Sequence, residues 1–197
     1  MNKINQNKIT FRLILLAIFI IFSSLTILCL PVLFNYKSKA EQIEKNYYKN
    51  FKIYLNSLGG ISYKPFPKPH LVVENALLNL PNSQKKNEFT KTSNLKIFIS
   101  LRSIYLRSMK YFNSTEISDS NLEFKTSDLI HLRKHLYEKI NKPIVLSNCK
   151  IFIKNKQKEV VLITPIKKLT NKINTKTKIK NLNINGEIFG LKFKSNW

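Results

Sequence analysis

A long apolar run stands near the start of the chain. From Leu13 to Phe34 no residue is charged and nearly all are apolar. At 1.5 Å per residue, a helix over this run spans roughly 33 Å, enough for the hydrocarbon core of a bilayer. A cleavable signal peptide has a shorter apolar region of about 7–15 residues, although Ser38-Lys39-Ala40 resembles a cleavage site. We predict a cytoplasmic tail at residues 1–10 and an uncleaved transmembrane signal anchor at residues 11–34.

Basic residues flank both ends of this run, so charge alone does not fix its orientation. The positive-inside rule needs an excess of Lys and Arg on one side of the membrane. The flanking residues are Lys3, Lys8 and Arg12 before the run, and Lys37, Lys39, Lys45 and Lys49 after it. Only the short N-terminal tail favours a cytoplasmic start.

Apolar residues then recur at steps of three and four. They are Ile43, Tyr47, Phe51, Tyr54, Leu55 and Leu58. This spacing places them on one face of an amphipathic helix. Gly59-Gly60 offers a stop, because glycine readily adopts the left-handed conformation that often follows a helix. We predict a juxtamembrane helix within residues 35–60 that continues from the anchor and covers one end of a sheet.

After this helix the period of the apolar pattern changes to two, which is typical of half-buried strands. In the clearest example, Leu95, Ile97, Ile99 and Leu101 alternate with mostly polar residues. The predicted strands are 70–80, 95–101, 104–112, 116–125, 144–154, 159–163, 178–185 and 187–194. So many short strands favour an antiparallel meander.

One helix interrupts the predicted strands near residues 127–140. Ser127 or Asp128 can cap its start, and Pro143 follows its end. Its apolar stripe consists of Leu129, Leu132, Leu136 and Ile140. The predicted fold class is therefore α+β, mainly antiparallel β. An N-terminal transmembrane helix precedes a β-rich domain at residues 61–197, in which a sheet or groove packs against one helix.

The last predicted strand runs from Glu187 into Trp197 with no turn or polar tail after it. A sheet left in this way has an open edge, and natural proteins usually cover or blunt such an edge. We expect either a partner protein at this edge or further sequence beyond residue 197.

The composition excludes several classes of protein. With 43% hydrophobic residues the chain is too apolar for complete disorder, and two cysteines are too few for a disulfide-stapled scaffold. The formal net charge is +23, but the basic residues are scattered and nearly all are lysines. Proteins that bind phosphate and read bases rely on the planar fork of arginine. We interpret the charge as compositional, and keep a cytoplasmic module that binds nucleic acid or anionic headgroups as an alternative.

The sequence offers no recognisable catalytic or cofactor site. His131 and His135 have a spacing that can bind zinc, with Glu138 as a third ligand. The metalloprotease motif requires Glu beside the first histidine, where this chain has Leu132. No nucleophile context or paired carboxylates stand out. We therefore predict no enzyme activity, no metal site and no cofactor.

The order of these features resembles the N-terminal region of the AsmA-like envelope proteins of Gram-negative bacteria. After the anchor and the helix, residues 60–75 (GISYKPFPKPHLVVEN) are similar to the start of the first hairpin in that family. Asp119-Ser120-Asn121-Leu122 and Leu146-Ser147-Asn148-Cys149 look like its recurring strand openings. Ile184-Asn185-Gly186-Glu187-Ile188-Phe189 is similar to one of its strand pairs. The resemblance covers roughly the whole chain, although family members are usually longer.

The resemblance implies a periplasmic β-rich groove, anchored in the inner membrane and connected with phospholipid movement or outer-membrane assembly. An apolar sheet face can shelter acyl chains, since each buried CH₂ contributes about 0.8 kcal/mol. The candidate groove residues are Leu95, Ile97, Ile99, Leu101, Leu182, Ile184, Leu191 and Phe193. The same residues could instead be ordinary core beneath the 127–140 helix. A further alternative is an anchored scaffold whose open sheet edge recruits an envelope protein.

Overall fold

The protein divides into two compact units, residues 1–34 and 35–197. The computed structural model describes residues 3–79, 90–106, 108–127, 129, 140, 142–173 and 180–196. The first unit is the helix α1 (Lys3–Cys29), which continues into the short 3₁₀ helix η1 (Leu30–Leu33).

Within the described residues, one helix is long and apolar enough to cross a membrane, and it extends over Phe11–Leu33. Its large apolar side chains are exposed to the surroundings, as expected for a segment that lipid would cover. A signal sequence meets the same criteria of length and composition. The structure thus confirms a single N-terminal apolar helix of membrane-spanning length.

The predicted continuous helix from the anchor to Gly60 is wrong. Pro31 lies in η1, where its missing N–H ends the regular helix, and a second 3₁₀ turn, η2 (Lys37–Lys39), follows. The helix α2 then covers only Ala40–Phe51. Lys52 ends it in the left-handed conformation, with its N–H 2.7 Å from the Tyr48 carbonyl oxygen.

The residues after α2 form a strand instead of a further helical turn. This strand, β1 (Tyr54–Ser57), pairs antiparallel with β3 (His70–Asn79). Leu55 lies opposite Leu78, and both side chains are buried. Tertiary pairing has therefore overridden a helical spacing that continued past Phe51 as far as Leu58.

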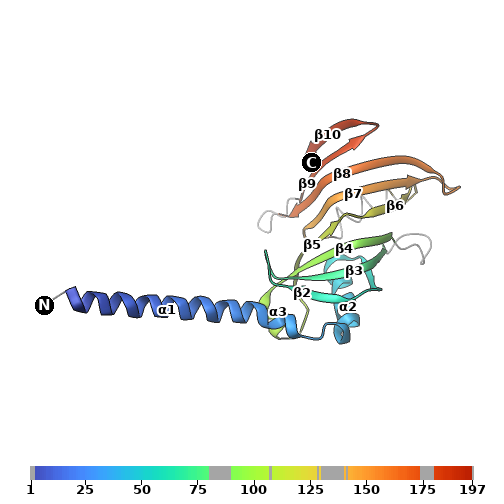
Figure 1. Cartoon of the computed structure of the whole chain (residues 1–197). Coiled ribbons are helices and arrows are strands. Elements are labelled where there is room, and N and C mark those ends of the chain that lie inside the picture. Colours follow the sequence, from blue (N-terminus) through green and yellow to red (C-terminus); the bar gives the residue numbers. More distant parts are fainter. Residues whose placement is uncertain are drawn as a thin grey trace. The chain divides into compact units, whose positions relative to one another are not determined.

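Within the residues that the structure describes, the second unit is built on one sheet of ten strands (Figure 1). Its main order is β1-β3-β4-β5-β7-β8-β9-β10, with β2 paired to β3 and β6 paired to β7. The remaining strands are β2 (Ile61–Lys64), β4 (Thr90–Ile99), β5 (Phe112–Ser118), β6 (Asn121–Lys125), β7 (Ile144–Lys154), β8 (Val160–Ile173), β9 (Lys180–Ile188) and β10 (Leu191–Asn196). The predicted α+β class with a mainly antiparallel sheet is confirmed.

Two pairings depart from the predicted meander, because β7 runs parallel to both β5 and β6. Parallel neighbours need a long crossover, and the chain between Lys125 and Ile144 provides it. The helix predicted at 127–140 belongs to this connection, but most of it lies outside the described residues. Ile140, the last residue of its predicted stripe, is fully buried.

The predicted strand at 104–112 is also wrong. Its first residues belong to the short helix α3 (Leu101–Tyr105). The Ser103 N–H donates to the Ser100 hydroxyl at 3.4 Å, so Ser100 caps the helix. A serine cap has thus turned an apolar segment into a helical turn.

A line of left-handed residues crosses the sheet. They are Asn75, Asp119 and Asn148, with φ angles of 51°, 52° and 53°. The residues that precede them, Glu74, Ser118 and Ser147, belong to a single row of paired residues across neighbouring strands. The three left-handed residues therefore lie on one line. Asp119 also separates β5 from β6, where the sequence predicted one strand. We call this line the crease.

The crease shifts the alternation of side chains by one residue, as a β-bulge does. In β3 the buried side chains before Asn75 include Leu71 and Val73, and those after it include Ala76 and Leu78. Without the shift, Ala76 and Leu78 would point to the opposite face. The crease therefore keeps one face of the sheet apolar along the full length of its strands.

Candidate functional site

A row of apolar side chains crosses the sheet on one face. Residues paired directly across neighbouring strands point to the same side, so the register defines the row. Its members are Val73, Leu95, Ile117, Leu146, Leu169 and Ile184, on strands β3, β4, β5, β7, β8 and β9 in that order. We call these residues the apolar row, and the side they occupy the apolar face.

Helix α2 covers the β3–β5 end of the apolar face. Ile43, Tyr47 and Phe51 from α2 are fully buried. The Phe51 ring stacks with Phe112 of β5 at a centroid distance of 6.5 Å. The Tyr47 hydroxyl lies 3.3 Å from the Thr115 hydroxyl, also on β5. This end of the sheet is therefore a closed core.

Polar side chains on both sides of α2 form hydrogen bonds that hold the helix in place. Gln42 and Asn46 donate to the Ser108 carbonyl oxygen, at 3.2 and 3.4 Å. On the other side, Glu44 accepts from both the N–H and the hydroxyl of Ser57 in β1, at 2.7 and 2.6 Å. Such bonds to backbone and hydroxyl groups fix the helix on the sheet. Helix α2 is thus held in its position on the sheet by specific hydrogen bonds.

Two ionisable groups of this domain are buried, Tyr47 on α2 and Cys149 on β7. Burial raises the pKa of the Tyr47 hydroxyl well above its usual range, despite the opposing bond to Thr115. Burial also raises the pKa of the Cys149 thiol, which lies 3.5 Å from the Ile117 carbonyl oxygen. Both groups stay protonated at neutral pH, so Cys149 is a packing residue without the character of a nucleophile.

The β7–β9 end of the apolar face is only partly covered. Leu146, Leu169 and Ile184 are all half-exposed, whereas Val73 and Leu95 at the other end have no exposed surface. Exposure rises further at the turn between β9 and β10, where Phe189 is 83% exposed and Leu191 is 75% exposed. Along the apolar row, exposure therefore rises from β5 towards β9, whereas Ile144, Cys149 and Ile166 on β7 and β8 are buried.

The eight predicted groove residues do not form one surface. Leu95, Ile97 and Ile99 are at most 2% exposed, so they are core residues. Leu101 is half-exposed and begins α3 instead of lining the sheet. The other four lie together at the open end, where they share one side of the β9–β10 pair: Leu182, Ile184, Leu191 and Phe193.

The opposite side of the same strands is polar. In β9, Asn183 and Asn185 alternate with Leu182 and Ile184, and both asparagines are exposed. Their partner residues in β8 are Thr170 and Lys168. The open half of the sheet is thus amphipathic, with one apolar face and one polar face.

The sheet ends at β10, which pairs with β9. Figure 1 shows this hairpin at one end of the sheet, with β2 and α2 at the other. Lys192 and Lys194 lie on β10, and lysines on an edge strand discourage indiscriminate pairing between sheets. Within the described residues, β10 pairs with β9 alone.

The sequence predicted that this helix covers one end of a sheet, but not that it packs on β5. The buried face was visible as Ile43, Tyr47 and Phe51, but the pattern holds no signal for the surface on which it packs. The asparagines of the crease could have been recognised, because Asn75 and Asn148 lie in the segments that resemble the AsmA-like family. Asn and Asp tolerate the left-handed conformation better than other residues with a side chain.

The part of the chain that the structure describes holds no group of three or more His, Cys, Asp or Glu side chains placed to share a metal ion. His131 and His135 lie outside the described residues. No protein-family model matches the chain, and a search of curated proteins found no match.

Proposed function

We propose that this is a membrane-anchored envelope protein of the AsmA-like type, whose open apolar face binds or guides phospholipid acyl chains. The observation that carries the proposal is the apolar row, which is closed by α2 at β3–β5 and half-exposed at Leu146, Leu169 and Ile184. The apolar helix at Phe11–Leu33 would hold this face close to a source of lipid. The proposal assigns no catalytic residue.

The energetics favour an acyl chain at the open end. Each CH₂ that leaves water contributes about 0.8 kcal/mol, so a segment of five or six carbons contributes about 4 kcal/mol. The strip formed by Leu182, Ile184, Leu191 and Phe193 supplies a continuous apolar contact for such a segment. Leu191 is exposed and the other three side chains are partly exposed, and apolar side chains gathered at a surface are typical of a binding site.

A pair of charged substitutions tests the proposal. Leu182→Lys with Ile184→Lys places two ammonium groups on the apolar face of β9, where burial by an acyl chain would desolvate them. The matched control is Asn183→Lys with Asn185→Lys, which adds the same charge to the other face of the same strand. Each full-length variant is purified in a mild detergent, and its phospholipid is extracted and measured by mass spectrometry.

We expect the apolar-face variant to retain several-fold less phospholipid than the wild type, and the control to retain the wild-type amount. Thermal unfolding should show both variants folded, because the four side chains are half-exposed or exposed. Equal phospholipid in both variants, in folded protein, would refute the proposal.

The orientation of the domain forms part of the same proposal. Phospholipid movement in the envelope places residues 35–197 in the periplasm, with the inner membrane as partner and Lys3, Lys8 and Arg12 on the cytoplasmic side. Reporters that are active only in the periplasm or only in the cytoplasm, fused after Trp197, distinguish the two orientations. A periplasmic signal is the expected result. A cytoplasmic signal would exclude the AsmA-like interpretation and favour the alternative of nucleic acid or anionic headgroups.

A second candidate function is recruitment of an envelope protein at the open edge. The supporting observation is β10, an edge strand with Leu191 exposed beside the equally exposed Phe189. A peptide strand added at this edge would form main-chain hydrogen bonds and bury both side chains. Leu191→Asp should then abolish partner capture while the phospholipid content stays unchanged. Loss of phospholipid with no loss of a partner would reject this second candidate.

A further inference from the structure

The polar face of the sheet contains a separate groove. Its volume is about 650 Å³, within the range of small-molecule sites. The lining residues come from β4, β5, β7 and β8 and from the segments beside Pro69 and Leu101. The groove lies across the sheet from the apolar row, because Glu116, Val145 and Thr170 are paired with one another on the other side. It does not depend on the proposed lipid function.

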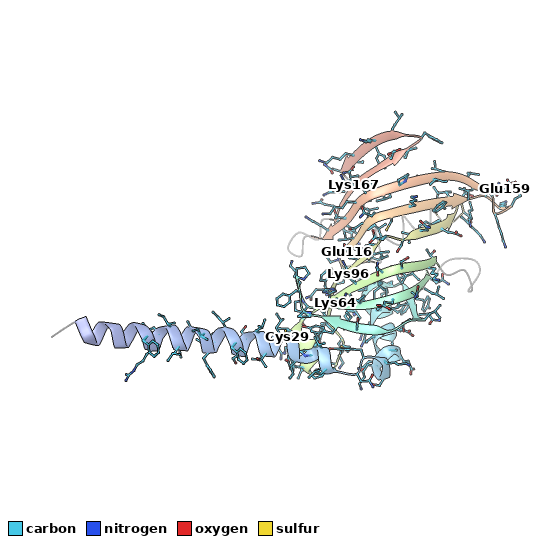
Figure 2. The ribbon with its side chains drawn as sticks, in the orientation of Figure 1. Cys29, Lys64, Lys96, Glu116, Glu159 and Lys167 are labelled. Carbon is cyan, nitrogen blue, oxygen red and sulfur yellow. The ribbon has the colours of Figure 1, made fainter. Side chains whose placement is uncertain are left out.

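Three lysines line this groove: Lys68, Lys168 and Lys172. None of the three forms an ion pair within the described part of the chain. A fourth lysine, Lys96, sits on the same face opposite Glu116, and Figure 2 labels both residues on adjacent strands. Unpaired ammonium groups around a concave surface concentrate positive potential there. The groove therefore favours an anionic ligand.

Hydroxyl groups and one carboxylate complete the polar part of the groove. Ser114, Ser147 and Thr170 can each donate to an anion. The Ser147 hydroxyl also lies 3.1 Å from an oxygen of Glu116, the one acidic side chain in the lining. Lysines with hydroxyl donors suit a phosphate group, which offers several acceptor oxygens.

The lining of the groove also includes apolar residues. They are Phe98, Leu101, Val145 and Pro69. A ligand that suits both the polar and the apolar lining carries a phosphate group and a compact carbon-rich portion. We propose that this groove binds a phosphate-bearing small molecule, either a phospholipid headgroup with the start of its chains or a free phosphate ester.

Binding to the full-length protein in a nonionic detergent tests this proposal. The probes are inorganic phosphate, glycerol 3-phosphate and dihexanoyl phosphatidylglycerol, each titrated by calorimetry at low ionic strength. We expect saturable binding of at least one phosphate ester. Binding of the lipid alone would identify a headgroup site, and binding of glycerol 3-phosphate as well would show that a free ester suffices.

Charge variants with opposite expected effects assign the binding to this groove. Lys168→Glu with Lys172→Glu should weaken binding roughly tenfold or more, because two attractive charges become repulsive. The arginine pair Lys168→Arg with Lys172→Arg should retain binding. Glu116→Gln removes the one carboxylate and should tighten binding by roughly twofold to fivefold.

The matched control is Lys150→Glu with Lys156→Glu, the same charge change at two exposed lysines outside the groove. We expect this control to change the affinity by less than about twofold, since exposed charges at a distance are screened. Equal weakening in the control and in the groove variant would overturn the proposal. So would an absence of saturable binding for all three probes to folded wild-type protein, or weaker binding after Glu116→Gln.

Discussion

The two halves of the sheet use the same apolar row in different ways. At β3 to β5 the row is closed by α2, and Leu95 has no exposed surface. At β7 to β9 the row continues through Leu146, Leu169 and Ile184, which are half-exposed. The register links both halves directly, so strand pairing alone does not determine which half is core. The difference comes from the helix α2, which covers one half.

If the proposed function holds, this difference separates the residues that stabilise the domain from those that bind lipid within one sheet. The covered half supplies the closed core that a domain needs, fastened by Gln42, Glu44 and Asn46. The open half presents an apolar face and a polar face on the same strands. Substitutions in the covered half should therefore act on folding, and substitutions in the open half should act mainly on binding.

The largest expected contrast in stability compares Phe51→Ala with Ile184→Ala. Phe51 is fully buried against Tyr47 and Phe112, so its truncation should cost about 3–5 kcal/mol of unfolding free energy. Ile184 is half-exposed, and its truncation should cost about 1 kcal/mol. Denaturant unfolding of both variants measures the difference. Equal losses of unfolding free energy in the two variants would contradict the distinction between the covered half and the open half.

A smaller effect on stability is expected at the crease. Its left-handed residues keep apolar side chains on one face of the sheet in both halves. Asn148→Ala should cost roughly 1–2 kcal/mol, because alanine disfavours the left-handed conformation. Asn148→Gly should cost less, since glycine adopts this conformation freely. Asn183→Ala, in regular strand, should stay within about 0.5 kcal/mol of the wild type. The decisive observation is a greater loss of stability in Asn148→Ala than in Asn148→Gly.

The smallest effect concerns pH and is confined to the covered half. The pKa of Tyr47 is raised in the folded state, so folded protein binds the phenolic proton more tightly than unfolded protein. Its contribution to stability is complete below the usual tyrosine pKa of about 10 and is lost as the pH rises above that value. Tyr47→Phe should cost about 1 kcal/mol at neutral pH through the lost bond to Thr115.

Unfolding midpoints of wild type and Tyr47→Phe, measured from pH 8 to pH 11, test this statement. The wild type should lose more stability than the variant over the alkaline part of the range. A constant difference between the two proteins would show that Tyr47 ionises as easily in the folded state as in the unfolded state.

Much of the fold could be predicted from local patterns. The strand at 144–154 was predicted with the bounds of β7, and the strand at 70–80 nearly with those of β3. The apolar helix near the N-terminus followed from its length and composition. These elements are determined by their own sequence, because alternation or a long apolar run needs no distant partner to be recognised.

Other features depend on tertiary partners and could not be predicted. The end of α2 at Phe51 reflects the pairing of β1 with β3, and the parallel pairing of β5 with β7 depends on a crossover. For the site, the alternation of Leu95 and Ile97 resembles that of Leu182 and Ile184. Within the described residues, α2 packs on β5 next to the strand of the first pair, which is buried, whereas the second pair is partly exposed.

The most direct test of the central claim is lipid crosslinking on the two faces of β9. A photoreactive amino acid replaces Ile184 in one full-length variant and Asn183 in the other, and both are irradiated in membranes before mass analysis. If the open apolar face holds acyl chains, phospholipid adducts form at position 184 and are nearly absent at position 183. Adducts of equal abundance at both positions, or none at position 184 in folded protein, would contradict the account.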